Sequence, residues 1–178
     1  MKKLSMLAIA IFLAGCADSH SLNVSNAEIV NKIPSTSSAY VALSEDGSYG
    51  SKNYVGSGRL LSNVIRSGLV THINDVTVAE NPESLKSSIT TAQGNGSDIL
   101  FYPTILHWED RATEWSGKAD KVKVKIVTWD VKQNTEVSSA IIDGASGLAT
   151  FGGDHPQDLL PEPITAYINT LFIEAAQK

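Results

Sequence analysis

Residues 121–131, KVKVKIVTWDV, alternate between lysine and aliphatic side chains over their first half. Successive side chains of a β-strand point to opposite faces of the sheet. The pattern therefore places the lysines on one face and Val122, Val124 and Ile126 on the other. Residues 135–146, TEVSSAIIDGAS, indicate a hairpin partner across KQNT. The chain must therefore build a sheet and cover at least one of its faces.

Three further extended segments are predicted. Short β-type runs at residues 39–44 and 75–80 indicate two strands, and residues 97–115 indicate a longer extended region. Pro103 interrupts that region. Because proline cannot donate to a strand ladder, Pro103 requires either a bulge or an edge position.

Helices are expected between these strands. Residues 58–73 carry apolar side chains at helical spacing, with Ser57 expected as N-cap, and residues 81–96 and 161–178 predict two more helices. The order is β-α-β-α-β-β-β-α. It predicts an α+β (α/β-like) fold, in which a mixed sheet of about five strands is packed by about three helices.

Length and composition limit the classes of function that the chain can have. The chain has 178 residues, a formal net charge of −5 and 42% hydrophobic residues, which indicates one globular domain. A nucleic-acid partner is not expected, because the balance is acidic and aromatic residues make up only 7%.

The first residues have the organisation of a bacterial secretion signal. Lys2 and Lys3 precede a short apolar run, which small residues follow. The sequence Leu-Ala-Gly-Cys that ends at Cys16 resembles the lipobox of bacterial lipoproteins. That resemblance implies that residues 1–15 are removed and that Cys16, the chain's only cysteine, carries diacylglycerol and further acyl chains such as palmitate. Two or three acyl chains would anchor the protein almost irreversibly to a membrane.

The residue after Cys16 is Ala17. The resemblance to Gram-negative lipoproteins implies the outer membrane, with the domain facing the periplasm, because aspartate at that position retains such proteins in the inner membrane. Residues 16–38 are predicted to contain the lipidated cysteine and a flexible tether that spans roughly 25 Å on average. Residues 39–178 are then one globular periplasmic domain.

Three motifs resemble a known family. They are DGSYGSKNYVGSG, YPTILHWEDRATEWSGK and ATFGGDHPQDLLPEP, in this order. Together they resemble the bacterial lipoproteins of domain-of-unknown-function family 4823, a family that implies a lipoprotein but no particular activity. The glycine-rich start, the helix SGRLLSNVIRSGL and the strand after it are more loosely similar to lipoprotein domains of the curli-secretion and penicillin-binding-protein-activator type.

Residues 107–117, HWEDRATEWSG, concentrate ionisable and aromatic side chains. On a regular strand, one face carries the candidate contact residues His107, Glu109, Arg111 and Trp115. Three interpretations are open: a charged strand face of purely structural importance, a partner-binding face, and a metal or acid–base site.

The opposite face of that strand carries Leu106 and Trp108. If SGKAD connects it to the next strand, Glu109 faces the lysines and Trp108 lies across from the valines. Each such cross-strand Glu–Lys pair contributes only some tenths of a kcal/mol.

Two loops are further candidates. Residues 151–159, FGGDHPQDL, contain Asp154 and His155, which become ligands only if the loop folds over the strand; the alternative is a glycine turn that leads to a one-turn element capped by Asp158. The loop GSYGSKNYVGSG precedes a helix, as phosphate-binding loops do, but it lacks the P-loop's Gly-Lys-Ser/Thr ending. A flexible connection to a capped helix is its simpler interpretation.

The leading hypothesis is a non-enzymatic, lipid-anchored envelope protein. It would need no cofactor, and its domain would bind another envelope protein or a glycan. One alternative is a metal- or small-ligand-binding module that uses His107, Glu109, Asp154 and His155. An envelope hydrolase is the other, although the sequence has no nucleophile elbow and its only cysteine is assigned to lipid.

Overall fold

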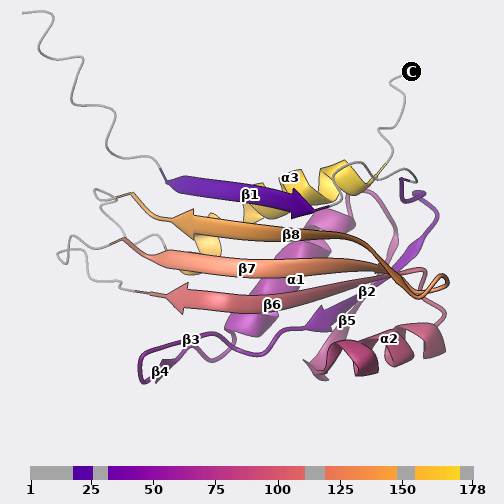
Figure 1. Ribbon diagram of the computed structural model, residues 1–178, viewed down its shortest axis with the longest axis horizontal. Coiled ribbons are helices and arrows are strands. Elements are labelled where there is room, and N and C mark those ends of the chain that lie inside the picture. Colours follow the sequence, from indigo (N-terminus) through magenta and orange to yellow (C-terminus); the bar gives the residue numbers. More distant parts are fainter. Residues whose placement is uncertain (1–17, 26–31, 111–118, 148–154, 173–178) are drawn as a thin grey trace, which may run out of the picture.

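The computed structural model describes residues 18–25, 32–110, 119–147 and 155–172, which form one mixed sheet packed by helices (Figure 1). The sheet has six strands in the order β1-β8-β7-β6-β2-β5. These strands are β1 (Ser19–Ser25), β2 (Ser38–Leu43), β5 (Asp75–Pro82), β6 (Ile99–Glu109), β7 (Lys121–Asp130) and β8 (Thr135–Ala145). The helices are α1 (Ser57–Leu69), α2 (Leu85–Gly94) and α3 (Pro161–Leu171).

The predicted α+β class is confirmed, with more strands than expected. Strand β2 runs parallel to β5 and to β6, whereas all other neighbouring strands are antiparallel. The predicted strands and helices are present in the predicted order. The additional elements are β1 and a small hairpin of β3 (Ser48–Tyr49) and β4 (Lys52–Asn53). The one-turn element expected beside Asp158 is the 3-10 helix η1 (Pro156–Leu159).

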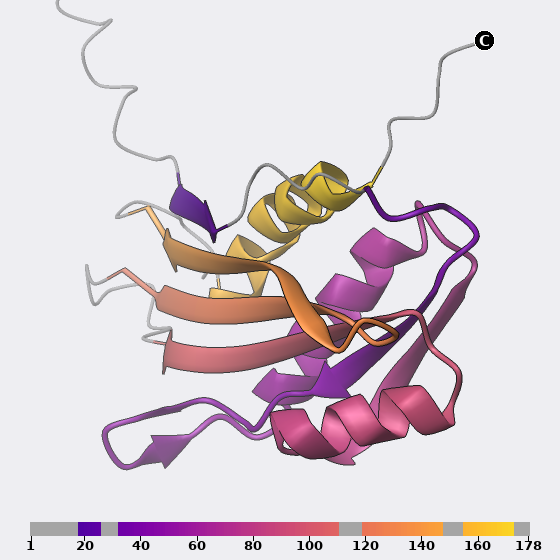
Figure 2. The same ribbon diagram turned by 45° about the vertical axis from the view of Figure 1, so that its right-hand side comes forward.

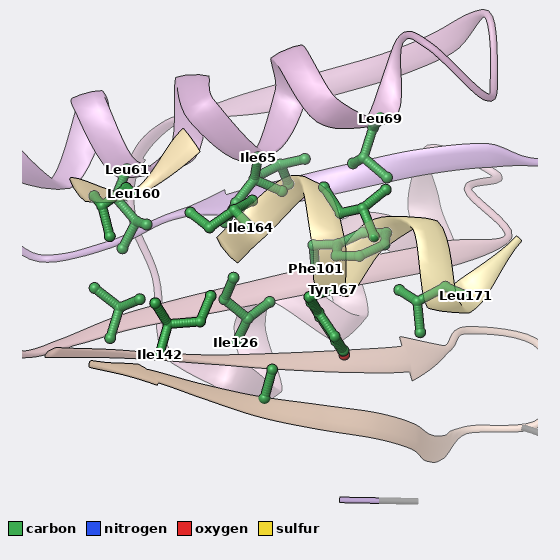
Figure 3. Close-up of a cluster of buried hydrophobic side chains, with 14 of the residues drawn as sticks. Leu61, Ile65, Leu69, Phe101, Ile126, Ile142, Leu160, Ile164, Tyr167 and Leu171 are labelled. Atoms are coloured by element: carbon green, nitrogen blue, oxygen red, sulfur yellow. The ribbon is translucent and has the colours of Figure 1, made fainter. Parts of the chain in front are cut away.

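Helices α1 and α3 cover one face of the sheet and form the main core with it (Figure 3). The two helices approach closely at Gly68, where a Cβ atom would lie 2.6 Å from Cδ1 of Ile168. Large side chains that are fully buried in this core include Leu61, Ile65, Leu69, Phe101, Ile126, Ile142, Ile164 and Tyr167.

A second, smaller core lies on the other face, under helix α2 (Figure 2). Alternate residues of β2 supply both cores: Ala39 and Val41 pack in the first, and Tyr40 and Ala42 in the second. Burial on both faces explains why β2 is a continuous apolar run rather than an alternating one.

Helix α2 is shorter than the predicted range of residues 81–96. It begins at Leu85, because the hydroxyl of Ser84 caps it by accepting a hydrogen bond from the amide of Ser87 at 3.2 Å. Pro82, which the sequence places in the first turn of the helix, instead ends β5.

The structure corrects the tether predicted for residues 16–38. Residues Ser19–Ser25 form strand β1, which pairs antiparallel with β8 along its whole length. Leu22 and Val24 are half-buried against the main core, while the alternating residues Ser21, Asn23 and Ser25 are exposed. The polar sequence concealed this strand, which forms because β8 offers an open row of backbone hydrogen-bonding groups.

Pro103 occupies the predicted edge position. Strand β2 pairs with β6 only from Ile99 to Phe101, so that beyond Phe101 the described part of the sheet pairs β6 with β7 alone. The missing amide hydrogen of Pro103 therefore interrupts no ladder. The helices of the described residues include none that is long and apolar enough to span a bilayer.

Candidate functional site

The predicted site residues lie at one end of the sheet, at the left of Figure 1. His107 and Glu109 are near the end of β6, and His155 immediately precedes η1. Cys16, Arg111, Trp115 and Asp154 lie outside the described residues. The site can therefore be built only from the residues at 107–110 and from those that follow residue 154.

A β-bulge shapes the end of β6. The register with β7 shifts between Ile105 and His107, which leaves Leu106 as the extra residue. Leu106 is 50% exposed, whereas Trp108 is 2% exposed and packs in the main core. The prediction that these two residues share a face was therefore wrong.

The predicted register after the bulge is confirmed. Glu109 lies opposite Lys121, and Trp108 lies opposite Val122. The next lysine, Lys123, pairs with Asp143 of the following strand, with its Nζ atom 2.9 Å from Oδ2.

His107 and Glu109 form the first pair of the site. Nε2 of His107 lies 3.3 Å from Oε2 of Glu109. The side chain of Glu109 is only 3% exposed, and that of His107 is 35% exposed. The ring of Tyr49, in the β3–β4 hairpin, meets the imidazole edge-on at a centroid distance of 5.3 Å. A strand face with a charged sequence thus contains a buried carboxylate.

Asp110 and His155 form the second pair. Nδ1 of His155 lies 3.6 Å from Oδ1 of Asp110, so the end of β6 and the 155–158 turn meet in space. The carboxylate of Asp158 accepts a hydrogen bond from the amide of His155 at 2.9 Å, which confirms its predicted capping role. The turn packs on β8 at Gly144, where a Cβ atom would lie 3.1 Å from Cβ of Leu159.

Tyr54 fixes the backbone at this point. Its hydroxyl accepts a hydrogen bond from the amide of Asp110 at 3.2 Å and lies 3.3 Å from the carbonyl oxygen of the same residue. The strand end is thereby attached to the segment that precedes α1.

Each pair offers one imidazole and one carboxylate, which are two potential ligands for a cation. A zinc site requires three or four ligands. Within the described ranges, no three His, Cys, Asp or Glu residues lie close enough together to hold a metal ion. The predicted four-residue ligand set also includes Asp154, which is outside those ranges.

The glycine-rich loop before α1 has a structural function. Asp46 caps the helix: its two carboxylate oxygens accept hydrogen bonds from the amides of Gly56, at 3.0 Å, and Gly58, at 2.9 Å. These are the donors that a bound phosphate would use. The expected N-cap, Ser57, is instead the first helical residue, and its hydroxyl accepts from the amide of Gly47 at 2.8 Å. The prediction for Ser57 was therefore wrong.

Sequence reasoning overlooked Tyr49, Tyr54 and the capping role of Asp46. One signal was present, because Gly50 followed by Ser51 is typical of a two-residue hairpin loop, and Gly50 adopts a φ of 60° there. A hairpin at this position would have placed both tyrosines beside a neighbouring element.

The comparisons with known proteins agree with this fold. A search of curated proteins gives no match. The PelC dodecamer from Paraburkholderia phytofirmans is similar in structure, with a TM-score of 0.64 at 14% identity, covering 88% of this chain and 100% of that chain. Lipoprotein GNA1162 from Neisseria meningitidis gives a TM-score of 0.46 at 15% identity, covering 75% of this chain and 96% of that chain.

The family model described as Domain of unknown function (DUF4823) matches residues 31–171, which include every described helix and all strands of the sheet except β1. The chain therefore belongs to the DUF4823 family.

Proposed function

We propose that this chain is a lipid-anchored protein of the Gram-negative envelope, whose periplasmic domain is a binding module rather than an enzyme. The observation that carries the anchoring is the leader that ends in Leu-Ala-Gly-Cys at Cys16. The outer membrane is the proposed location, because Ala17 follows the lipidated cysteine.

Replacing Cys16 and Ala17 tests this proposal. Cys16→Ser should accumulate as an unprocessed precursor, seen as an intact mass that retains the leader and lacks diacylglycerol. Ala17→Asp should move the protein from outer- to inner-membrane fractions, whereas Ala17→Ser should leave it in place. Normal processing of Cys16→Ser would contradict lipidation, and an unchanged location of Ala17→Asp would contradict the proposed sorting.

The binding role is supported by what the site's polar groups already contact. His107 faces Glu109, His155 faces Asp110, and Asp46 fills the helix terminus that could have held a phosphate. Polar side chains gathered at the end of a rigid sheet, beside its connecting segments, are a common arrangement for binding.

In-cell cross-linking tests the binding role. A photo-reactive residue at Leu106, which is 50% exposed beside the site, should capture an envelope protein or glycan. The same group at Val55, which is 90% exposed beyond the hairpin, is the matched control. Equal capture from both positions would contradict a partner at the strand end, and substrate turnover by the purified domain would contradict the non-enzymatic role.

Self-assembly is a second candidate function, which the similarity to PelC favours. The PelC structure is that of a dodecamer, and it is matched over its whole length. Closed rings form through repeated heterologous contacts between identical subunits. Light scattering of the detergent-solubilised protein should give a mass of many protomers, and the mass of a single protomer would rule this candidate out.

A further inference from the structure

We infer that the end of the sheet at which β1 begins lies against the membrane, so that the His107–Glu109 and Asp110–His155 pairs face lipid headgroups. This inference rests on the proposed lipidation of Cys16. It goes beyond that proposal because a lipid anchor alone does not determine the orientation of the domain relative to the membrane.

The short connection between anchor and sheet carries the inference. Strand β1 starts at Ser19, three residues after Cys16. Three residues of fully extended chain span at most about 10 Å. Asp18 is held as well, because its Oδ1 atom accepts a hydrogen bond from the amide of Gly147 at 3.0 Å. The sheet therefore begins almost at the lipid, without the tether of roughly 25 Å that an unstructured segment would supply.

The strand register shows what lies beside this anchor point. Ser19 pairs with Ala145, Ala145 with Lys121, and Lys121 with Glu109. One row across four strands thus connects the start of β1 to the candidate site. Helix α3 begins at the same end, because Nε2 of His20 lies 3.4 Å from Oε1 of Glu162.

The bilayer surface fits the end of the sheet, whereas the envelope partner proposed above is assigned to the sheet face that exposes Leu106. Strand β7 runs from Lys121 at this end to Asp130 at the other, which separates the two ends by roughly 30 Å. An anchor that reaches only about 10 Å can hold one end of such a sheet at headgroup level but not the other. Lys121 is exposed at the near end and can pair with lipid phosphate.

The single cysteine of the chain makes a direct test possible. When the sulfur of Cys16 carries lipid, an introduced cysteine is the only free thiol. Lys121→Cys at the near end and Gln133→Cys in the β7–β8 turn at the far end are both exposed, so both should fold. Each full-length lipidated protein is labelled with a fluorophore. It is then reconstituted into phosphatidylethanolamine–phosphatidylglycerol vesicles that contain a headgroup quencher.

The label at position 121 should be quenched at least about twofold more strongly than the label at position 133, because the two lie roughly 30 Å apart. A second pair, Ser19→Cys and Ser25→Cys at the two ends of β1, should show the same order. Equal or reversed quenching in both pairs would overturn the inference. Failure of the unlabelled protein to float with vesicles would instead refute the anchoring itself.

Lengthening the segment between the anchor and β1 tests whether the short connection is what orients the domain. Insertion of about 20 Gly and Ser residues between Ala17 and Asp18 creates a flexible tether of roughly 25 Å. This variant should still float with vesicles but lose most of the contrast between positions 121 and 133. A contrast that survives the insertion would mean that something other than the short connection orients the domain, and this would overturn the mechanism proposed here.

Discussion

Asp46 shows how one side chain can join a loop to a helix. Helix α1 has no side-chain cap from the residue that directly precedes it, Gly56, which adopts a φ of 92°. The carboxylate of Asp46 reaches the helix terminus from ten residues upstream and accepts from two amides. It also places a negative charge at the positive end of the helix dipole.

Replacement of Asp46 by Ala should therefore lower the free energy of unfolding by about 1 kcal/mol, the usual cost of losing a helix cap. Urea denaturation of the lipid-free domain measures this. Glu45→Ala, a neighbouring exposed carboxylate, is the matched control and should change little. Equal losses in the two variants would show that general charge, rather than capping, is responsible.

Thr128 and Tyr167 form a hydrogen bond inside the main core. The two hydroxyls are 2.7 Å apart, and both residues are fully buried. Burial raises the pKa of the Tyr167 hydroxyl, which keeps it protonated and able to donate. The bond joins α3 to β7 at a point where neither hydroxyl can reach water.

A double-mutant cycle tests this bond. Thr128→Val or Tyr167→Phe alone should lower the free energy of unfolding by about 1–3 kcal/mol, because each leaves its partner hydroxyl buried without the other. The double variant should lose clearly less than the sum of the two single losses, since it removes both groups. Strict additivity in the cycle would show that the hydroxyls do not interact.

At the scale of elements, β1 is the strand that extends the sheet beyond the residues that match the family. It lies outside residues 31–171, which match the family, yet it pairs with β8 and packs Leu22 and Val24 on the core. The segment that precedes the family match is thus part of the folded domain.

Substitutions in β1 test this docking. Leu22→Ser with Val24→Ser should lower the free energy of unfolding by about 2 kcal/mol, because two half-buried aliphatic side chains are lost. Ser21→Thr with Asn23→Thr, on the exposed face of the same strand, should have little effect. If the first pair leaves the denaturation midpoint unchanged, then β1 contributes nothing to the fold.

Much of the architecture could be predicted at this scale. The strands and helices with a clear period, such as β7 and α1, were found because a buried face imposes that period on the sequence. Strand β1 was missed, because an edge strand with one half-buried face needs only Leu22 and Val24 to be apolar. The meeting of Asp110 with His155 was left open, because contacts between distant segments depend on how the elements pack.

For the whole molecule, one ion pair connects the beginnings of β2 and β6 to the turn between β7 and β8. Nζ of Lys132 lies 2.6 Å from Oδ1 of Asp98, whose other oxygen accepts from the amide of Ser38 at 2.9 Å. The Lys132 ammonium, followed by the Ser38 amide, lowers the pKa of Asp98 below its usual 3.8. The folded state therefore favours the ionised carboxylate.

This pKa shift predicts a pH dependence. The stabilisation from Asp98 is complete above pH 3.8, the usual pKa, and is lost as the pH falls through the lower pKa of the folded state. Asp98→Asn should thus be less stable than the wild type near neutral pH, and the difference should shrink in acid. Thermal melts from pH 7 to pH 2 measure it, with Asp75→Asn, which alters an exposed carboxylate, as the comparison. A constant difference across this range would contradict the prediction.

The bulge in β6 determines which single-residue deletions the strand can tolerate. Before the bulge, odd-numbered residues such as Phe101 and Ile105 face the main core, and after it the even-numbered Trp108 does. Leu106 is the extra residue that shifts the core-facing positions from odd to even numbers.

Deletion of Leu106 should therefore yield an uninterrupted strand in which Trp108 still faces the main core. Deletion of Thr104 should instead turn neighbouring side chains from the main core to the opposite face of the sheet, and the reverse. Soluble yield and the near-ultraviolet signal of the tryptophans would distinguish the two, and equal tolerance of both deletions would contradict this account. Loss of one residue at the bulge should thus shorten the chain without exchanging the inside of the sheet for its outside.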